Sequence, residues 1–517
     1  MLKKIYSYIV RPFIIRKIFK NELNNIKNIP ENKIILNSVR FVPNVFLMEL
    51  NLALIFLKSG YSVEIILDDG EFEHNDTVLY RSNKSFSYYS FIFSLNKVKR
   101  KIEFFLWKKI VGGITNNLNF TKVSEITKNI TTCFNLIDEK NYVKESMIRF
   151  FQTDRIDNDN IHIWYEKLTF KNVCISKKIG IYADNQLNKN NQTLFLTSHG
   201  IYSVWGPAFN EIKTEKRKIV YGPNFYQINS LSFFNHIHQV TNKEDSLLQF
   251  LKKDLSNSKI EKVSNYISNR FSFNEKDTKV YFANDSEKKQ FVLKDRKDLP
   301  GKVFVAYPNI VWDGNVYERN NLFITISDWI ITLIEHFKKD NTNSLIIRFH
   351  PAETTWFKGT KTFESIIKQH LKGIESFDNI IIISSAVSFN SYNLLKNYSD
   401  YTLVYDGIIG LESTFFNVPV IFAANGRFNV SDYGIQFYSA EDYMGYISNP
   451  KSYNKIESDK IIAQKLIYYY MFVNSRFFPV LDNENSDFGL DIDVFYKNKE
   501  KFNLSIDSIM KGINECL

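Results

Sequence analysis

The segment Arg348–Glu353 has residue types that bind anionic ligands. Arg348, His350 and Glu353 come directly after 345–347, an apolar run typical of a buried strand. A guanidinium and an imidazole at the end of a strand could bind a phosphate or a carboxylate. The structural alternative is a histidine bonded to backbone groups and an arginine in a surface ion pair. The residues themselves favour neither interpretation.

A second segment, 405–413, runs from a strand into a helix through Gly407 and Gly410. Glycine lets the backbone approach a ligand closely. The start of a helix presents unpaired N–H groups and the positive end of a dipole to a diphosphate, without a metal ion. Glu412 could accept hydrogen bonds from ribose hydroxyls, or it could cap the same turn. Ser413 is the last residue of this candidate phosphate cradle.

Residues at other strand ends could also contact a substrate. Trp312 follows the strand-like run 302–307 and could stack on a base or a sugar, although aromatic side chains are more often part of a core. In the first half of the chain, Asp69 and His199 each follow an apolar run, and either could be a general base. Asp68 and Asp69 are also residue types that favour a turn after a strand.

Alternating strand and helix patterns place the residues of the second half at strand ends. Strands are expected at 302–307, 344–349, 379–383, 401–405 and 419–423, with helices at 323–338, 363–371, 391–398 and 411–416. This alternation predicts a parallel sheet covered on both faces. In such sheets, ligands bind outside the carboxyl ends of the strands.

The first half of the chain predicts a second α/β domain. Strands are expected at 33–37, 61–67, 173–175, 179–181, 194–196 and 218–221, helices at 46–58 and 207–213, and mainly helical structure at 75–150 and 241–300. A strand, a helix and a second strand at the start are typical of a doubly wound fold. The expected fold class is therefore α/β, with two halves and a cleft between them.

Composition and charge exclude several classes of protein. The chain has 517 residues and only three cysteines, which excludes a disulfide scaffold and a cysteine-rich zinc module and fits a reducing compartment. His236 and His238 lie two residues apart without a nearby third ligand, so no metal site is expected. No apolar run reaches the roughly 20 residues that cross a bilayer.

The formal net charge of +10 suits an anionic partner. No nucleic-acid-binding signature accompanies this charge, and basic residues are spread along the chain, so nucleic acid is not expected as a partner. The basic N-terminal segment 1–20 could lie as a helix on an anionic membrane surface. The alternative, a helix packed on the body of the protein with Pro12 marking a break, is slightly favoured.

Five segments, in this order and spacing, resemble bacterial capsular or surface polysaccharide glycosyltransferases of the GT-B fold. The segments are 198–207 (SHGIYSVWGP), 308–313 (PNIVWD), 348–353 (RFHPAE), 403–412 (LVYDGIIGLE) and 418–421 (VPVI). The resemblance covers about residues 190–440. Asp406 and Gly407 depart from the Thr or Ser that is typical of the first part of the cradle, and an acid facing a diphosphate is costly unless it turns away.

The resemblance implies two Rossmann-like domains and a metal-independent transfer, with a nucleotide-sugar as co-substrate and no further cofactor. We expect a basic segment at 1–30, an acceptor-side domain at 31–300, a donor-side domain at 301–480 and a tail at 481–517. Arg348 and His350 would face the donor phosphates, Gly407–Ser413 would form the cradle, and Glu412 would bind the ribose. The acceptor would be a glycan or a lipid-linked glycan, in the cytoplasm or at the inner face of the cytoplasmic membrane.

Other activities remain open. An Asp-Asp-Gly segment with a His-Pro segment also resembles sialyltransferases and Kdo transferases, which use CMP-linked donors; there the Asp is the base and the His contacts the phosphate. A glycerophosphotransferase of the teichoic-acid type and a nucleotide-sugar epimerase are enzymatic alternatives. A non-catalytic scaffold of a polysaccharide assembly complex is the alternative without chemistry.

Overall fold

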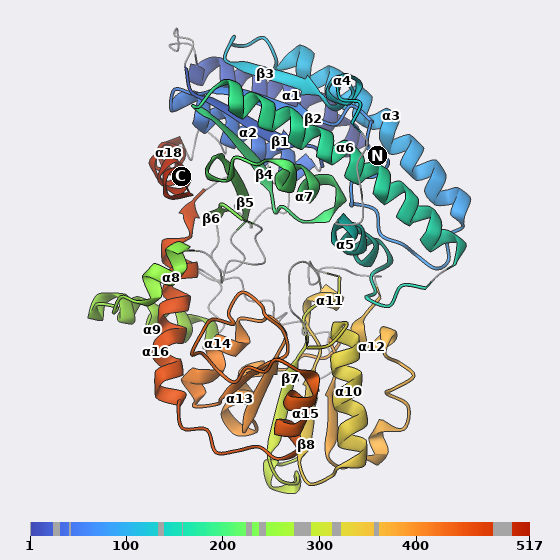
Figure 1. The fold of residues 1–517 in the computed structure, drawn as a ribbon, viewed down its shortest axis with the longest axis vertical. Coiled ribbons are helices and arrows are strands. Elements are labelled where there is room, and N and C mark those ends of the chain that lie inside the picture. The colour runs from blue at the N-terminus through green and yellow to red at the C-terminus, as the bar shows by residue number, and fades with distance from the viewer. Residues whose placement is uncertain are drawn as a thin grey trace. The chain divides into compact units, whose positions relative to one another are not determined.

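The computed structural model consists of two compact units, each built around its own sheet (Figure 1). Unit 1 contains Met1–Phe150, Asn158–His238 and Asn474–Leu517, and unit 2 contains Phe151–Asp157 and Gln239–Val473. The residues that the structure describes are 2–23, 31–40, 43–132, 139–157, 159–223, 230–236, 245–272, 291–312, 322–355, 361–478 and 499–516.

Unit 1 has a seven-stranded sheet in the order β12-β6-β5-β4-β1-β2-β3. Five strands are parallel: β1 (Lys33–Ser38), β2 (Ser62–Leu67), β3 (Leu118–Lys122), β4 (Thr193–Ser198) and β5 (Lys218–Pro223). β6 (Ser230–Phe234) and β12 (Arg476–Phe477) extend one edge in antiparallel pairing. The helices are α1 (Leu2–Leu23), α2 (Pro43–Lys58), α3 (Phe86–Ile110), α4 (Val123–Asn129), α5 (Lys140–Phe151), α6 (Asn160–Lys189), α7 (Tyr202–Glu211) and α18 (Lys499–Cys516).

The core of unit 1 explains why α2 is apolar around almost its whole circumference. β1 and β2 pack on one side of α2, while α1 and α18 pack on another. Residues from Phe46 to Leu57 are almost all buried in this core. A helix that is covered on all sides has no polar face.

The strands expected at 173–175 and 179–181 are wrong, because both segments lie inside α6. Buried residues of α6 recur at helical spacing, as at Val173, Ser176, Ile179 and Ala183. A short apolar run does not distinguish a strand from a buried helix. Gly180 lets α6 pack closely on α7, since a Cβ there would lie 2.5 Å from the carbonyl oxygen of Ala208.

Unit 2 has five parallel strands in the order β11-β10-β7-β8-β9. The strands are β7 (Val303–Tyr307), β8 (Ser344–Arg348), β9 (Ile380–Ile383), β10 (Tyr401–Val404) and β11 (Val420–Phe422). The helices are α8 (Asp245–Leu251), α9 (Asn257–Phe271), α10 (Ile326–Lys339), α11 (Ala352–Thr355), α12 (Phe363–Ile366), α13 (Ser391–Asn397), α14 (Ile409–Ser413), α15 (Ala440–Ser448) and α16 (Ile456–Tyr468). All five strands expected in this half are confirmed, within one residue at either end.

Helices cover both faces of the sheet of unit 2. Trp329 and Leu333 of α10 belong to the core on one face, and Leu394 and Leu395 of α13 belong to the core on the other. Thr325 caps the start of α10 by accepting a hydrogen bond from the N–H of Asp328. The α/β fold class with two Rossmann-like units, as the GT-B-like prediction requires, is confirmed.

The division between the units differs from the expected boundary at residue 300. Contacts group the chain from Gln239 onward with unit 2, because α8 and α9 pack on α16. At the other end, α18 returns to unit 1, where it packs on β6 and β12. The expected tail at 481–517 thus includes a helix that belongs to the core of unit 1.

The N-terminal segment forms α1, which packs on α2 and α3. Ile15, Ile18, Phe19 and Leu23 are buried in the core of unit 1, so the packed alternative is confirmed for the second half of this helix. Among the described residues, no helix combines the length and the apolar character that crossing a bilayer requires.

Candidate functional site

The predicted donor-side segments meet at the carboxyl end of the sheet of unit 2. β10, β7 and β8 are neighbours in the sheet, so the chain leaves all three strands at the same edge. Asn309, just after β7, joins two of these exits: its side-chain amide donates to the backbone oxygen of Asp406 (2.7 Å) and its side-chain oxygen accepts from the backbone N–H of Asp406 (3.1 Å). The structure thereby brings together segments that are nearly 100 residues apart in the chain.

His350 is a neutral hydrogen-bonding group. Burial and the nearby Arg348 guanidinium lower the pKa of His350 to about 4. Its Nδ1 accepts a hydrogen bond from the N–H of Ala352 (3.2 Å), so the single ring proton is on Nε2. A neutral imidazole of this tautomer can donate a hydrogen bond to an oxyanion, but it contributes no positive charge.

Arg348 supplies the positive charge near His350. Its guanidinium is buried and donates to the backbone oxygens of Ser384 (2.5 Å) and Val387 (3.4 Å) in the loop after β9. Burial lowers the pKa of Arg348 to about 10, so the group stays charged at neutral pH. The expected alternative of a surface ion pair is wrong, because Arg348 is buried and bonds backbone carbonyls.

Glu353 is buried beside these groups, in the first turn of α11. Its carboxyl accepts a hydrogen bond from the N–H of Phe363 at the start of α12 (3.3 Å). Burial raises the pKa of Glu353 from 4.5 to about 7. The residue therefore links two short helices while it is partly protonated at neutral pH.

We expect Glu353→Gln to stabilise the protein at high pH and to have little effect in acid. The folded state binds the Glu353 proton more tightly than the unfolded chain does, so this contribution to stability is present below pH 4.5 and is lost as the pH rises through about 7. Glutamine retains the hydrogen-bond acceptor but removes the buried charge. This change is expected to raise the free energy of unfolding by up to about 3 kcal/mol at pH 8. Thermal unfolding of both proteins at pH 5 and pH 8 measures this difference. Glu441→Gln, at an exposed site, is the matched control, and a gain from Glu353→Gln that does not depend on pH would contradict the prediction.

The turn from β10 into α14 combines one open position with tightly packed ones. A Cβ at Gly407 would meet only a methyl group of Ile409, at 3.5 Å, so the backbone there is accessible. A Cβ at Gly410 would lie 3.2 Å and 3.3 Å from methyl groups of Val404 and Val420, so this glycine lets α14 pack on the sheet. Ser413 donates to the backbone oxygen of Gly410 (3.0 Å) and is buried.

Glu412 forms a buried ion pair with Arg270 of α9. The carboxylate and the guanidinium are both almost fully buried, 142 residues apart in the chain. The structure therefore shows Glu412 in a tertiary contact between α14 and α9, and neither of its two expected roles, ribose binding and capping, is seen directly.

Asp406 turns toward Arg427, in the loop after β11. Its carboxylate accepts from the N–H of Arg427 (2.8 Å) and pairs with the Arg427 guanidinium (3.2 Å). Gly426 makes room for this contact, since a Cβ there would lie 2.4 Å from the carboxylate. The charge of Asp406 is thus compensated within unit 2.

Trp312 is buried, and stacking on a base would require it to become exposed.

In unit 1, Asp69 and Asp68 both have structural partners at the end of β2. The Asp69 carboxylate accepts from the N–H (3.0 Å) and the hydroxyl (2.5 Å) of Ser124, in the first turn of α4. Asp68 accepts from three backbone N–H groups of the following turn and forms an ion pair with Arg100 (2.5 Å). Asp68 therefore acts as the turn interpretation expects, whereas the Asp69 side chain is bonded to α4. A catalytic role of Asp69 stays a prediction.

His199 lies in a strained turn at the end of β4. Its φ is +54°, and that of Tyr202 is +64°, both in the left-handed region that non-glycine residues rarely adopt. The ring stacks on Trp205 and its Nδ1 bonds the hydroxyl of Ser198 (2.5 Å). Burial, followed by the charges of Arg40 and Arg149, lowers the pKa of His199 to about 3. Strained backbone of this kind is common at functional sites.

Sequence reasoning missed the two arginines near His199. Arg40 and Arg149 both donate to the backbone oxygen of Asp76, at 3.2 Å and 3.0 Å. Their guanidiniums also lie over the rings of Trp205 and Tyr202, at 5.0 Å and 5.4 Å from the ring centroids. Arg40 could have been predicted from the sequence as a candidate site residue, because it lies two residues after the end of β1. Arg149, inside α5, has no such signal.

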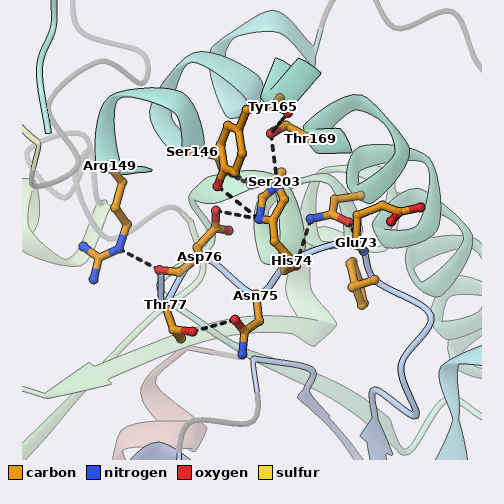
Figure 2. A network of polar contacts seen from close by, with 12 residues as sticks. Glu73, His74, Asn75, Asp76, Thr77, Ser146, Arg149, Tyr165, Thr169 and Ser203 are labelled. Atoms are coloured by element: carbon orange, nitrogen blue, oxygen red, sulfur yellow. Dashed lines mark hydrogen bonds and ion pairs between the residues drawn. The ribbon is translucent and has the colours of Figure 1, made fainter. Parts of the chain in front are cut away.

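A buried polar network around His74 and Asp76 includes Arg149 (Figure 2). Nδ1 of His74 lies 3.3 Å from the carboxylate of Asp76 and 3.2 Å from the hydroxyl of Tyr165, and Nε2 lies 3.0 Å from the hydroxyl of Thr169. Burial acts to raise the pKa of Asp76, but His74 and the two arginines lower it overall. Asp76 also has a positive φ, so three of the six described non-glycine residues with this conformation lie in this part of unit 1.

Within the described residues, no three His, Cys, Asp or Glu side chains are placed to hold a metal ion. No protein-family model matches the chain, and no curated protein sequence is significantly similar to it. Solved structures match only remotely.

Three of these structures illustrate the range. KpsC of Thermosulfurimonas dismutans, a beta Kdo 2,7 transferase, matches with 12% identity over 66% of this chain and 90% of that chain, at a TM-score of 0.35. Anabaena Alr3699/HepE, solved in complex with UDP and glucose, matches with 9% identity over 91% of this chain and 99% of that chain, at a TM-score of 0.25. The UDP-GlcNAc 2-epimerase from Neisseria meningitidis, bound to UDP-GlcNAc, matches with 13% identity over 86% of this chain and 100% of that chain, at a TM-score of 0.21. The fold assignment rests on the sheet topology of the two units.

Proposed function

We propose that this protein is a glycosyltransferase that moves a sugar from a nucleotide-activated donor, CMP-linked sugars included, to a capsular or surface glycan. The observation that carries the proposal is the convergence of the Asn309, His350 and Gly407 segments at the carboxyl edge of the parallel sheet of unit 2. Ligands bind at this edge in doubly wound folds. The proposal includes a cytoplasmic location.

The donor phosphates are proposed to bind next to His350 and Gly407. The Nε2–H of His350 donates to a phosphate oxygen, and the open backbone at Gly407 lets the diphosphate approach closely. The buried charge of Arg348 stabilises the negative charge that builds up on the departing phosphate. Arg348 and His350 supply this stabilisation without a metal ion. We assign structural roles to the other candidate residues. Glu412 forms the ion pair with Arg270, and Glu353 positions α11. The packing of the unit includes Gly410 and Ser413, and its interior includes Trp312.

The acceptor is proposed to bind to unit 1, with His199 as the base. Of the two candidate bases, His199 is favoured because the carboxylate of Asp69 is already bonded to Ser124. The imidazole is neutral at pH 7 and can accept a proton, although Arg40 and Arg149 make it a weak base. An acceptor that carries a phosphate or carboxylate near these arginines would offset their charge and raise the pKa of His199.

A thermal-shift experiment with CMP, UDP and GDP tests the donor site directly. One nucleotide at about 100 times its Kd is expected to raise the melting temperature by roughly 5 to 10 °C. His350→Ala is expected to remove most of this shift, whereas His370→Ala, at a partly exposed site on the same unit, is expected to retain it.

No shift with any nucleotide or nucleotide sugar would contradict the proposal and favour the non-catalytic scaffold. If a nucleotide binds, product analysis separates the enzymatic alternatives. An epimerase changes the donor when no acceptor is present, and a glycerophosphotransferase releases CMP from an alcohol phosphate donor. Transfer of a sugar to a glycan supports the proposal.

A further inference from the structure

One side of α3 exposes a continuous row of large apolar side chains. The row, here called the α3 stripe, consists of Tyr88, Phe91, Leu95, Val98, Ile102 and Phe105. Each of these side chains is between 41% and 64% exposed. Successive members are alternately three and four residues apart, which places them on one face of a helix of 25 residues. Such a helix is about 37 Å long, so the stripe is too extended to count as scattered surface residues.

The opposite side of α3 is already packed against unit 1. Phe93, Arg100 and Trp107, spaced seven residues apart, are buried. Arg100 forms the ion pair with Asp68 and donates to the backbone oxygen of Phe72 (2.7 Å). The orientation of α3 is therefore determined by its inner face. The α3 stripe makes no contribution to the core that would explain its apolar character.

Charged residues beside the α3 stripe are basic. Lys99, Lys101 and Lys108 flank it, and Lys109 lies at its C-terminal end. The single acidic residue of α3, Glu103, is buried and forms an ion pair with Lys99 (3.5 Å). An apolar face bordered by lysines matches an anionic lipid surface, where the apolar side chains enter the boundary region and the cations meet the headgroups.

Helix α1 also exposes basic and apolar side chains, next to the C-terminal end of α3. Arg16 donates to the backbone oxygen of Ile110, the last residue of α3 (2.5 Å), so the two helices meet there. Phe13, Arg16 and Lys17 of α1 are exposed. Basic and apolar side chains thus continue from α3 onto α1 within unit 1.

We propose that the α3 stripe binds the surface of an anionic lipid bilayer, with α3 lying in the plane of the interface. A second copy of this chain fits the stripe less well. In a helix pair formed through it, the flanking positions of both copies would be occupied by Lys99, Lys101 and Lys108, without exposed acids on α3 to pair with them. The proposal extends the membrane contact from the N-terminal segment, where the sequence suggested it, to α3. It does not depend on the transfer reaction.

Flotation with lipid vesicles tests the proposal without any sugar donor. The full chain is expected to float with vesicles of phosphatidylcholine and phosphatidylglycerol, to bind phosphatidylcholine alone much more weakly, and to be released by high salt. The double variant Phe91→Ser/Ile102→Ser is expected to lower the apparent partition coefficient at least about tenfold. Leu504→Ser, at an exposed leucine of α18, is expected to bind like the unmodified protein.

A charge variant separates the two contributions. Lys101→Glu/Lys108→Glu is expected to abolish the preference for phosphatidylglycerol while leaving far-ultraviolet circular dichroism unchanged. The proposal is overturned if the unmodified protein fails to float with anionic vesicles, or if Phe91→Ser/Ile102→Ser floats as well as it does. It is also overturned if the protein is a dimer in solution that this double variant converts to a monomer, because a second copy would then cover the stripe.

Discussion

Replacing His199 by asparagine is expected to lower the rate of sugar transfer at least about 100-fold while the protein stays folded. Asparagine tolerates the left-handed backbone at this position better than alanine does, so the change removes the imidazole with little added strain. It leaves no group that can take the proton from the acceptor hydroxyl. The initial rate at saturating donor, compared with the melting temperature of the same sample, separates lost chemistry from lost folding.

Asp69→Asn is the matched variant for the other candidate base. The amide oxygen can still accept from the N–H of Ser124, so α4 retains part of its cap. Transfer by Asp69→Asn is expected to stay within a few-fold of normal. If this variant instead loses activity and His199→Asn retains it, the base is Asp69 and the bond to Ser124 is broken during turnover.

Glu412→Ala is expected to destabilise the protein by about 3 to 5 kcal/mol, because it leaves the Arg270 guanidinium buried without its counter-charge. For a unit of this size, such a loss lowers the melting temperature by roughly 10 °C. Arg270→Met is expected to be similarly costly for the converse reason. The double variant Arg270→Met/Glu412→Leu is expected to recover much of the stability, since it removes both charges.

Calorimetry of the nucleotide-free protein measures this effect. Together with a measurement of nucleotide affinity, it also decides whether Glu412 binds the ribose or has a structural role. If Glu412→Ala melts within about 2 °C of the unmodified protein but binds nucleotide more weakly, the carboxylate serves the ribose and the ion-pair assignment is wrong. If stability falls and the double variant restores both stability and nucleotide affinity, the role is structural.

The sequence by itself determined the α/β class of both units and all five strands in the sheet of unit 2. Strand and helix alternation is a local periodicity, and Lys302–Ala423 carries it with little interruption. The same pattern also placed His350 and Gly407 at strand ends, because neighbouring parallel strands end at one edge. It failed at Val173 and Ile179, where short apolar runs belong to α6 and the local pattern is ambiguous.

Only the tertiary structure decided what each polar side chain contacts. Asp69 is bonded to Ser124, Glu412 to Arg270 and Asp406 to Arg427, and none of these partners is marked by spacing in the sequence. The same holds for the allocation of 239–300 to unit 2, which depends on how α9 packs against α16. The physical reason is that secondary structure follows from the order of residues along the chain, whereas ion pairs and pKa values follow from burial and distance, which exist only after distant segments have packed together.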